Sequence, residues 1–269
     1  MNVLISVNEY AYIGAKLTVF SFMKYHKNVN WFITTLNVEI EDPDAKVIHN
    51  HVGINEDMVT ELTRIVKYFD NNSNVKFIDV TDLYKENLFG SPNDLSGFTP
   101  FATIRLLSDL FIPEYIHDLL YIDIDTIICD NINNEYDKYT NISSPYAAHV
   151  INEACKDKGE MVSSVLFFNM DECRKRGFFK TARRNYMNNE YQYPDQMAIR
   201  DTCDPVEIEE SLNYMRELFE NKEPYKIVHF SNKLSPKIYY TTVDKFFKIF
   251  PQFNYLKEEM DIFDSINYD

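Results

Sequence analysis

Two aspartates interrupt one apolar run of the chain, Leu120-Tyr121-Ile122-Asp123-Ile124-Asp125-Thr126-Ile127-Ile128. If this run is a single strand, side chains two residues apart point to the same face, so Asp123 and Asp125 would lie side by side. Two like charges near the core of a sheet are costly unless a cation neutralises them. The run therefore predicts a divalent metal site with positions left open for diphosphate oxygens. The alternative is a strand that ends at Asp123, with both acids solvated or capping a turn.

The same letters fit a second kind of enzyme. An apolar strand followed by Asp-x-Asp-x-Thr is the pattern of haloacid dehalogenase-like phosphatases, in which Asp123 would be the nucleophile and Asp125 a general acid. That family carries the motif in its first strand and adds later acidic ligands behind a glycine. The glycines after Asp125 are Gly159 and Gly177, and neither has that context. The phosphatase is thus the second hypothesis.

Before this run, short apolar segments typical of strands alternate with segments of helical period, which predicts a βαβ order. A parallel sheet covered by helices follows from that order, with ligands bound at the carboxyl ends of its strands. An acidic stretch at 37–54 and the segment 88–97 lack periodicity and are expected to be irregular. The expected strands are 2–7, 31–36, 75–80, 119–129, 163–169 and 226–230, and the expected helices are 15–26, 55–69, 99–111, 171–187, 207–221 and a helical tail.

Composition excludes several classes of partner. The chain has 269 residues, 45% of them hydrophobic, which is enough to bury the core of one domain. Its net charge of −15 repels nucleic acid and anionic lipid. The four cysteines form no framework, and the N-terminal segment resembles neither a signal peptide nor a membrane anchor. We therefore expect a cytoplasmic protein that binds no nucleic acid and does not insert stably into a membrane.

A third segment, 226–237, joins a histidine to two cationic side chains. His229 ends an expected strand, and Lys233 and Lys237 follow in the next loop. Neutral imidazole can complete a metal site begun by carboxylates, and lysine pairs with phosphate. In an acidic protein this segment would supply the local positive charge that a nucleotide diphosphate needs. The alternative is a histidine satisfied at a strand end beside a solvated basic loop.

Together these segments resemble glycosyltransferase family 8, the glycogenin-like and bacterial lipopolysaccharide glucosyl- and galactosyltransferases. The resemblance extends over nearly the whole chain. It rests on five segments in order: Ile5-Ser6-Val7-Asn8-Glu9 with Gly14-Ala15, residues 99–131 with Arg105 and the Asp-x-Asp motif, Val165-Leu166-Phe167-Phe168-Asn169, Asp195-Gln196, and residues 229–236, which match the family's His-x-x-Gly-x-x-Lys-Pro loop.

The resemblance implies a GT-A fold: an α/β domain with a mixed, mostly parallel central sheet flanked by helices. It implies a nucleotide-binding half at 1–130, a sugar and acceptor half at 131–240, and a helical cap at 241–269. It also implies a retaining transfer of a hexose from a UDP-sugar to a glycan, protein or lipid acceptor. It leaves open whether the protein forms homo-oligomers. The implied ion is Mn²⁺, with Mg²⁺ as the alternative, held by Asp123, Asp125 and His229.

The resemblance also assigns roles to individual residues. Asp195 and Gln196 would act at the transferred sugar, and the charge on the leaving diphosphate would be offset by the ion and Lys233. The residues implied to bind the nucleotide sugar are Ile5, Ser6, Val7, Asn8, Arg105, Asp123, Ile124, Asp125, Asn232 and Lys233.

Some positions depart from the family pattern. Val162-Ser163-Ser164 stands where relatives carry Asn-Ala-Gly or Asn-Ser-Gly, His149 stands near a common aspartate, and Asn232 and Ser235 replace the loop's glycine and lysine. The donor sugar is therefore left open, and a binding protein without catalytic activity is the third hypothesis. Most of the aromatic residues are expected in the core or on the surface, and a few tyrosines, such as Tyr10, Tyr12 or Tyr193, could stack on uracil or on an acceptor sugar.

Overall fold

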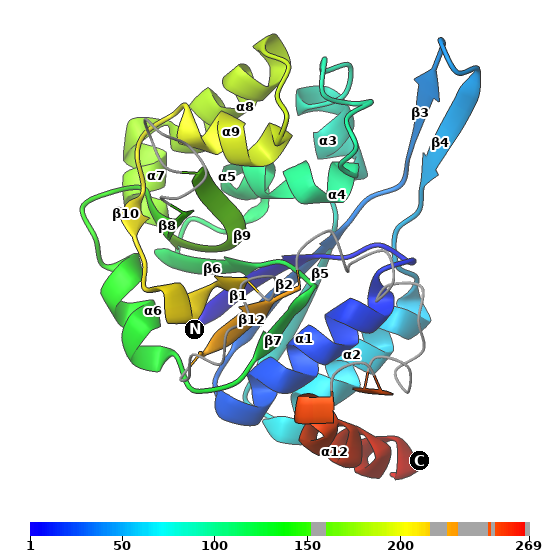
Figure 1. Ribbon diagram of the computed structural model, residues 1–269, viewed down its shortest axis with the longest axis vertical. Helices are drawn as coiled ribbons and strands as arrows, with labels where there is room; N and C mark the ends of the chain where they lie inside the picture. Colours follow the sequence, from blue (N-terminus) through cyan, green and yellow to red (C-terminus); the bar gives the residue numbers. More distant parts are fainter. Residues whose placement is uncertain (152–159, 216–224, 231–246, 249–250, 267–269) are drawn as a thin grey trace.

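A seven-stranded mixed sheet forms the centre of the molecule, with helices on both faces (Figure 1). The computed structural model describes residues 1–151, 160–215, 225–230, 247–248 and 251–266. The strand order is β10-β8-β9-β6-β1-β2-β5. These strands are β1 (Asn2–Ser6), β2 (Asn30–Thr35), β5 (Asn74–Asp79), β6 (Asp118–Ile122), β8 (Tyr146–Ile151), β9 (Glu160–Asn169) and β10 (Val206–Glu207).

The half of the sheet made by β6, β1, β2 and β5 is parallel, as the βαβ order predicts. β1 pairs with β2 in the register Leu4 to Phe32, and on its other edge with β6 in the register Leu4 to Tyr121. β9 runs antiparallel to both β6 and β8. The sheet is therefore mixed but mostly parallel, and the predicted α/β class is confirmed.

Two apolar cores lie on the two faces of this sheet. Val3 and Ile5 of β1 belong to the core under α1 (Tyr12–Tyr25) and α2 (Glu56–Phe69), whereas Leu4 belongs to the core on the opposite face. Successive residues of a strand point to opposite faces, so a strand buried on both sides reads as a continuous apolar run. This double burial explains why residues 2–7 carry no polar alternation.

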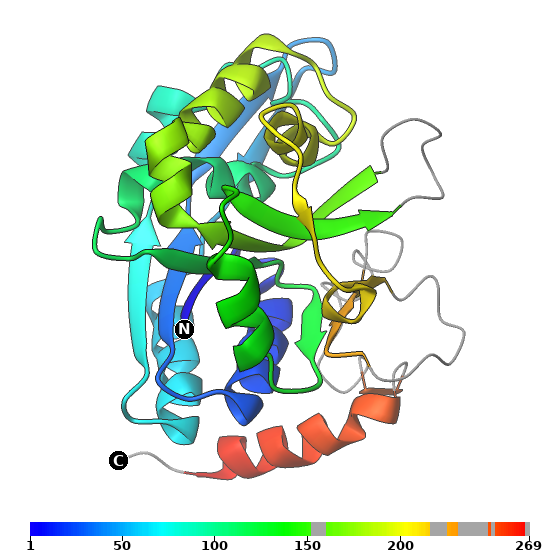
Figure 2. The same ribbon diagram turned by 90° about the vertical axis from the view of Figure 1, so that its left-hand side faces the viewer.

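Helices also cover the face of the sheet to which Leu4 points (Figure 2). Asn55 caps α2, since its side chain accepts a hydrogen bond from the Met58 amide at 3.0 Å. The remaining helices are α3 (Thr81–Asn87), α4 (Pro100–Thr103), η1 (Ile104–Leu107), α5 (Ser108–Phe111), α6 (Asn133–Thr140), α7 (Met170–Arg176), α8 (Phe178–Asn188), α9 (Pro194–Arg200), η2 (Glu210–Leu212), η4 (Pro251–Phe253) and α12 (Asn254–Ser265).

Two of the expected helices are broken in the structure. The segment 99–111 forms α4, η1 and α5 in succession, a tighter winding that turns the Arg105 side chain into the protein interior. The segment 171–187 forms α7 and α8, separated at Gly177, whose φ of 61° ends the first helix. The apolar residues keep their helical spacing across each break. The spacing therefore predicted one continuous helix in each segment.

Two other expectations are wrong. The acidic stretch 37–54 is a β-hairpin, β3 (Val38–Asp42) with β4 (Val47–His51), because Val38 and Ile40 alternate with acids and are buried on one face. The segment 207–221 is not one helix. Its described part contains the end of β10, η2 and β11 (Tyr214–Met215).

A small second sheet connects the middle of the chain to its later part. Its order is β11-β12-β7, with β12 (Ile227–His229) antiparallel to β7 (Thr126–Ile128). α12 packs against α1, where Phe263 contacts the Phe20 ring and Lys24 pairs with Glu259. No helix among the described ranges is both long and apolar enough to cross a membrane.

His26, at the end of α1, gives the fold a defined dependence on pH. The side chain is 1% exposed; Nδ1 donates to the Phe22 carbonyl at 2.8 Å, and Nε2 accepts from the Ile132 amide at 3.0 Å. Burial lowers the pKa of His26 to about 4. A second proton would turn Nε2 into a donor facing another donor, so only the neutral ring fits.

We expect the free energy of unfolding to fall as the pH drops from about 6.5 toward 4. The unfolded chain takes up the His26 proton first, and the shift corresponds to roughly 3 kcal/mol. His26→Gln offers a comparable donor and acceptor without titrating. Urea titrations at several pH values should therefore show a smaller loss in His26→Gln than in the wild type, and equal slopes would contradict this prediction.

Candidate metal and nucleotide-sugar site

The two aspartates of the central run lie in a turn and not within a strand. β6 ends at Ile122 and β7 begins at Thr126, so residues 123–125 leave one sheet and enter the other. The Asp123 amide donates to the Ser164 carbonyl at 2.8 Å, and the Asp125 carbonyl accepts from the Phe230 amide at 2.8 Å. Strand alternation therefore does not explain their proximity. The turn does, and it places both acids at the carboxyl end of β6.

His229 of β12 joins these two acids. One ligand atom from each of Asp123, Asp125 and His229 lies within 4.8 Å of the others, and His229 Nε2 is 3.4 Å from Asp125 Oδ1. Within the described part of the chain, Asp125 Oδ1 and His229 Nδ1 are buried without a hydrogen-bond partner. Two carboxylates and an imidazole can hold a divalent cation, and a buried carboxylate oxygen without a hydrogen-bond donor is what such an ion would satisfy. The residues fit a divalent metal.

The protonation of His229 depends on the neighbouring acids. Burial lowers its pKa, but Asp125 and, more weakly, Asp123 more than offset this, so the pKa is raised above 6.5. A proton on this ring partly neutralises the two carboxylates when no ion does so. A bound ion would replace that proton, because only neutral imidazole can be a ligand.

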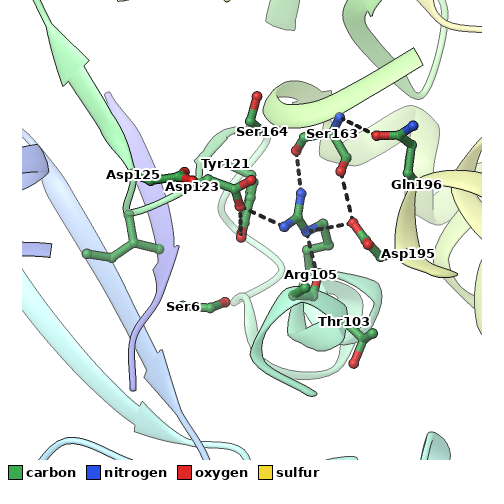
Figure 3. A network of polar contacts seen from close by, with 12 residues as sticks. Ser6, Thr103, Arg105, Tyr121, Asp123, Asp125, Ser163, Ser164, Asp195 and Gln196 are labelled. Atoms are coloured by element: carbon green, nitrogen blue, oxygen red, sulfur yellow. Dashed lines mark hydrogen bonds and ion pairs between the residues drawn. The ribbon is translucent and has the colours of Figure 1, made fainter. Parts of the chain in front are cut away.

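Arg105 lies beneath the aspartates and connects two parts of the site (Figure 3). Its side chain is 2% exposed; Nη2 donates to Asp123 Oδ1 at 2.7 Å, and Nε is 3.4 Å from Asp195 Oδ2. Nη1 donates to the Ser163 carbonyl. Burial lowers the pKa of Arg105, but Asp123, Tyr121 and Asp195 reverse this and raise it above its usual value. The guanidinium is thus a fixed buried cation that holds two carboxylates in place.

Tyr121 is a site residue to which the sequence assigned no role. Its hydroxyl donates to Asp123 Oδ1 at 2.7 Å, and its ring lies 3.8 Å from Cζ of Arg105. The same oxygen of Asp123 therefore accepts from a phenol and a guanidinium. These two donors fix the carboxylate, as residues behind metal ligands commonly do. The only indication of this contact in the sequence was that Tyr121 and Asp123 lie two residues apart.

Asp195 and Gln196 at the start of α9 face the strand that carries Ser163. Asp195 Oδ2 accepts from Ser163 Oγ at 3.0 Å, and Gln196 Oε1 accepts from the Ser163 amide at 3.3 Å. Burial raises the pKa of Asp195 and nearby Asp123 adds to this, whereas Arg105 opposes it. The structure thus brings Arg105, Asp123, Asp195 and Gln196 into one network.

The segment Ile5-Ser6-Val7-Asn8 leaves the carboxyl end of β1 next to this network. Ile5 and Val7 are fully buried, and Ser6 Oγ lies 3.1 Å from Thr34 Oγ1, so a nucleotide could reach these three residues only through small or backbone atoms. Asn8 is half-buried, and its Oδ1 accepts from the Ala11 amide at 2.6 Å. Ile124 lies in the turn with only 8% exposed. Asn232 and Lys233 lie outside the described residues.

Two further polar residues near the site have unsatisfied atoms. Asn213, between η2 and β11, bonds through Oδ1 to Ser164 Oγ at 2.9 Å. Among the described residues its Nδ2 has no hydrogen-bond partner, and neither does His149 Nδ1 on β8. Asn213 was missed because it lies in the segment expected to be helical. His149 pairs with Val162 across the sheet and Asn213 bonds to Ser164, so both contact the segment that departs from the Asn-Ala-Gly pattern.

Comparison with known proteins identifies the fold. No protein-family profile matches the sequence, and no curated protein matches it. The structure of the galactosyltransferase LgtC in complex with donor and acceptor sugar analogs superposes with a TM-score of 0.65 at 15% identity, covering 92% of this chain and 99% of LgtC. A structure of an active-site mutant of LgtC also gives a TM-score of 0.65, at 16% identity, covering 86% of this chain and 88% of the mutant.

A mammalian enzyme has the same architecture. Mouse xyloside xylosyltransferase 1 superposes with a TM-score of 0.62 at 11% identity, covering 87% of this chain and 99% of that one. Similarity at such low identity establishes the fold alone. The chain therefore has the GT-A glycosyltransferase fold, with its Asp-Asp-His cluster at the carboxyl end of a central strand.

Proposed function

We propose that this protein is a retaining glycosyltransferase of family 8 type that transfers a hexose from a UDP-sugar. The observation that carries the proposal is the convergence of Asp123, Asp125 and His229 within 4.8 Å in a GT-A fold. In open α/β sheets, ligands bind at the carboxyl ends of the strands, and this cluster lies at such an end.

In this proposal Asp123, Asp125 and His229 hold Mn²⁺, with Mg²⁺ as the alternative. The ion would offset negative charge on the departing diphosphate. Arg105 and Tyr121 keep the Asp123 carboxylate in place. Ile5, Ser6, Val7 and Asn8 contact the nucleoside, and Asn232 and Lys233 contact the diphosphate. Ile124 positions the two aspartates on either side of it.

Asp195 and Gln196 are proposed to orient the transferred sugar. Asp195 Oδ2 accepts a hydrogen bond from Ser163 and pairs with Arg105, and the residue is only 4% exposed, so the carboxylate is poorly placed to attack a sugar carbon. This arrangement favours attack by the acceptor hydroxyl from the face that the diphosphate leaves, which retains the anomeric configuration.

The remaining features follow the same proposal. Residues 1–130 form the nucleotide-binding half, 131–240 the sugar and acceptor half, and 241–269 a cap. The acceptor is a glycan, protein or lipid, and the net charge of −15 argues against nucleic acid. A cytoplasmic location without stable membrane insertion fits the same composition. Self-association is compatible with this proposal.

The phosphatase hypothesis fits the geometry less well. It requires Asp123 to be a nucleophile, yet Asp123 Oδ1 already accepts from Arg105 and Tyr121 at 2.7 Å each. Two strong donors lower the nucleophilicity of a carboxylate. No observation favours this hypothesis over the transferase.

Thermal stabilisation by ligands tests the proposal. A ligand at 100 times its dissociation constant stabilises the native state by about 2.7 kcal/mol, and for a chain of this size each kcal/mol raises Tm by about 2–4 °C. We therefore expect UDP and UDP-hexoses to raise Tm by about 5–10 °C with Mn²⁺ and by much less in EDTA. Absence of any Mn²⁺-dependent shift with UDP-glucose, UDP-galactose and UDP itself would contradict the proposal.

A further inference from the structure

The β3–β4 hairpin projects from the rest of the molecule (Figure 1). A large groove opens beside it. Its volume is about 950 Å³. We call it the hairpin groove and define it by Tyr10 of the β1–α1 loop, Asn37, Asn50 and His51 of the hairpin and its base, and Lys85 and Phe89 at the end of α3. Its volume lies in the range of ligand-binding pockets, about 300–1,000 Å³.

The base of the groove is fixed to the loop that follows β1. The Glu9 amide donates to the Val52 carbonyl at 3.1 Å, and Asn8 forms a β-bridge with Gly53. Gly53 passes so close to β2 that a Cβ there would lie 2.5 Å from Thr35 Oγ1 and 2.9 Å from the Leu36 carbonyl. The backbone at the base of the groove is thus paired with the end of the segment proposed to contact the nucleoside.

Phe89 on the opposite wall is held by ordered backbone. Its amide donates to the Tyr84 carbonyl at 3.1 Å, and the Gly90 amide donates to Asp94 Oδ2 at 2.7 Å. The Phe89 ring is nevertheless 44% exposed, and Tyr10 is 57% exposed. Two large rings are therefore exposed at the groove, one of them on hydrogen-bonded backbone, although burying each would be favourable.

The charges of the lining favour a neutral occupant. Lys85 and Glu39 both line the groove, and burial together with His49 lowers the pKa of His51, so that ring is neutral at pH 7. In a chain of net charge −15, one lysine balanced by one glutamate gives an anion little reason to bind. A lipid chain would need a continuous apolar wall, but Asn37, Asn50 and His51 interrupt it.

Exposed rings combined with amides and a neutral imidazole match the chemistry of a sugar. A pyranose has an apolar face that packs on an aromatic ring, and hydroxyls at its edge that pair with amide and imidazole groups. We infer that the hairpin groove binds a neutral oligosaccharide, as the part of the acceptor remote from its reacting end. This inference rests on the proposed transferase function.

Binding of fluorescently labelled full-length protein to an array of glycans tests the inference. The array carries neutral oligosaccharides of two to seven units together with sialylated and phosphorylated ones. We expect binding to neutral chains, and calorimetry with the best of them should show affinity at least tenfold weaker in Phe89→Ala. Phe89→Tyr keeps a ring and should retain affinity. Tyr115→Ala removes a ring that is 74% exposed outside the groove and is the matched control.

Each result has a defined meaning. Binding confined to charged glycans, binding to none, or unchanged affinity in a Phe89→Ala protein of normal Tm would overturn the inference. The Mn²⁺-dependent Tm shift with UDP is measured on the same preparation. If that shift is present and neutral glycans do not bind, the groove assignment alone is wrong. If glycans bind and the shift is absent, the transferase proposal fails, and with it the groove's role as an acceptor site.

Discussion

Asp125→Asn is expected to lower sugar transfer by about 100- to 1,000-fold and to abolish the Mn²⁺-dependent Tm shift with UDP. Asp125 Oδ1 is buried without a hydrogen-bond partner among the described residues, and it faces His229. The amide keeps the volume of the side chain but cannot supply a charged ligand. Removing one preorganised electrostatic group from an active site typically costs that much in rate. UDP release from a UDP-hexose donor measures the effect.

The matched control for this change is Asp130→Asn. Asp130 follows β7, and its Oδ1 accepts from the Asn131 amide, outside the metal cluster. It should leave the UDP-dependent Tm shift intact. A full Mn²⁺-dependent shift in Asp125→Asn would show that Asp125 is not a metal ligand, whatever the activity of the variant.

Arg105→Met is expected to destabilise the fold by about 3–5 kcal/mol, because it leaves Asp123 and Asp195 without their buried cation. Methionine retains much of the apolar stem, so packing accounts for little of this loss. The remaining Asp195 carboxyl would be forced toward its protonated form. Arg105 lowers the pKa of Asp195, so its removal raises that pKa further above the unfolded value. Stability is then lost as pH increases through the raised pKa, so the deficit should be larger at pH 7 than at pH 4. Urea denaturation at the two pH values measures it.

A double variant separates the lost charge pair from a general packing defect. Arg105→Met combined with Asp195→Asn removes the buried charge as well as its partner, and it should recover part of the stability. If the double variant is as unstable as the sum of the two single variants, the two side chains are not coupled. A loss below about 1 kcal/mol in Arg105→Met would contradict the role assigned to the guanidinium.

The sequence was a good guide for strands that are buried on both sides and for one amphipathic helix. The runs at 2–7, 31–36 and 163–169 lie in β1, β2 and β9, and the polar–apolar period at 55–69 lies in α2 with its Asn55 cap. In these places burial and local preference favour the same conformation, so the pattern predicts the element.

It was a poor guide where long-range contacts decide the local conformation. The run at 119–129 looks continuous because β6 and β7 are both buried, yet the chain passes from one sheet to another between them. In the hairpin at 38–51, Val38 and Ile40 are buried because they pack into the same core as Tyr84 of α3, a contact that the local sequence does not reveal. Apolar periodicity has no information about which sheet a residue joins. It therefore led to a cluster that the structure does bring together, Asp123, Asp125 and His229, but through incorrect local geometry.

The network behind those candidates could not be predicted for the same reason. Tyr121, Arg105 and Ser163 meet only because β9 runs antiparallel to β6 and places Ser163 opposite the end of that strand. Resemblance to known enzymes singled out Arg105 but not its contacts. Nothing in the local sequence around Asn213 indicated its bond to Ser164.

The pairing of β12 with β7 joins segments about a hundred residues apart, since Ile227 lies opposite Ile128. His229 therefore reaches the aspartates only after this long loop has closed, and such closures are entropically costly and late in folding. An ion bound by all three side chains would connect β12 to the turn after β6. It would thus oppose local opening of the later part of the chain, in the way that a covalent cross-link does, but reversibly and at a strength set by the concentration of the metal.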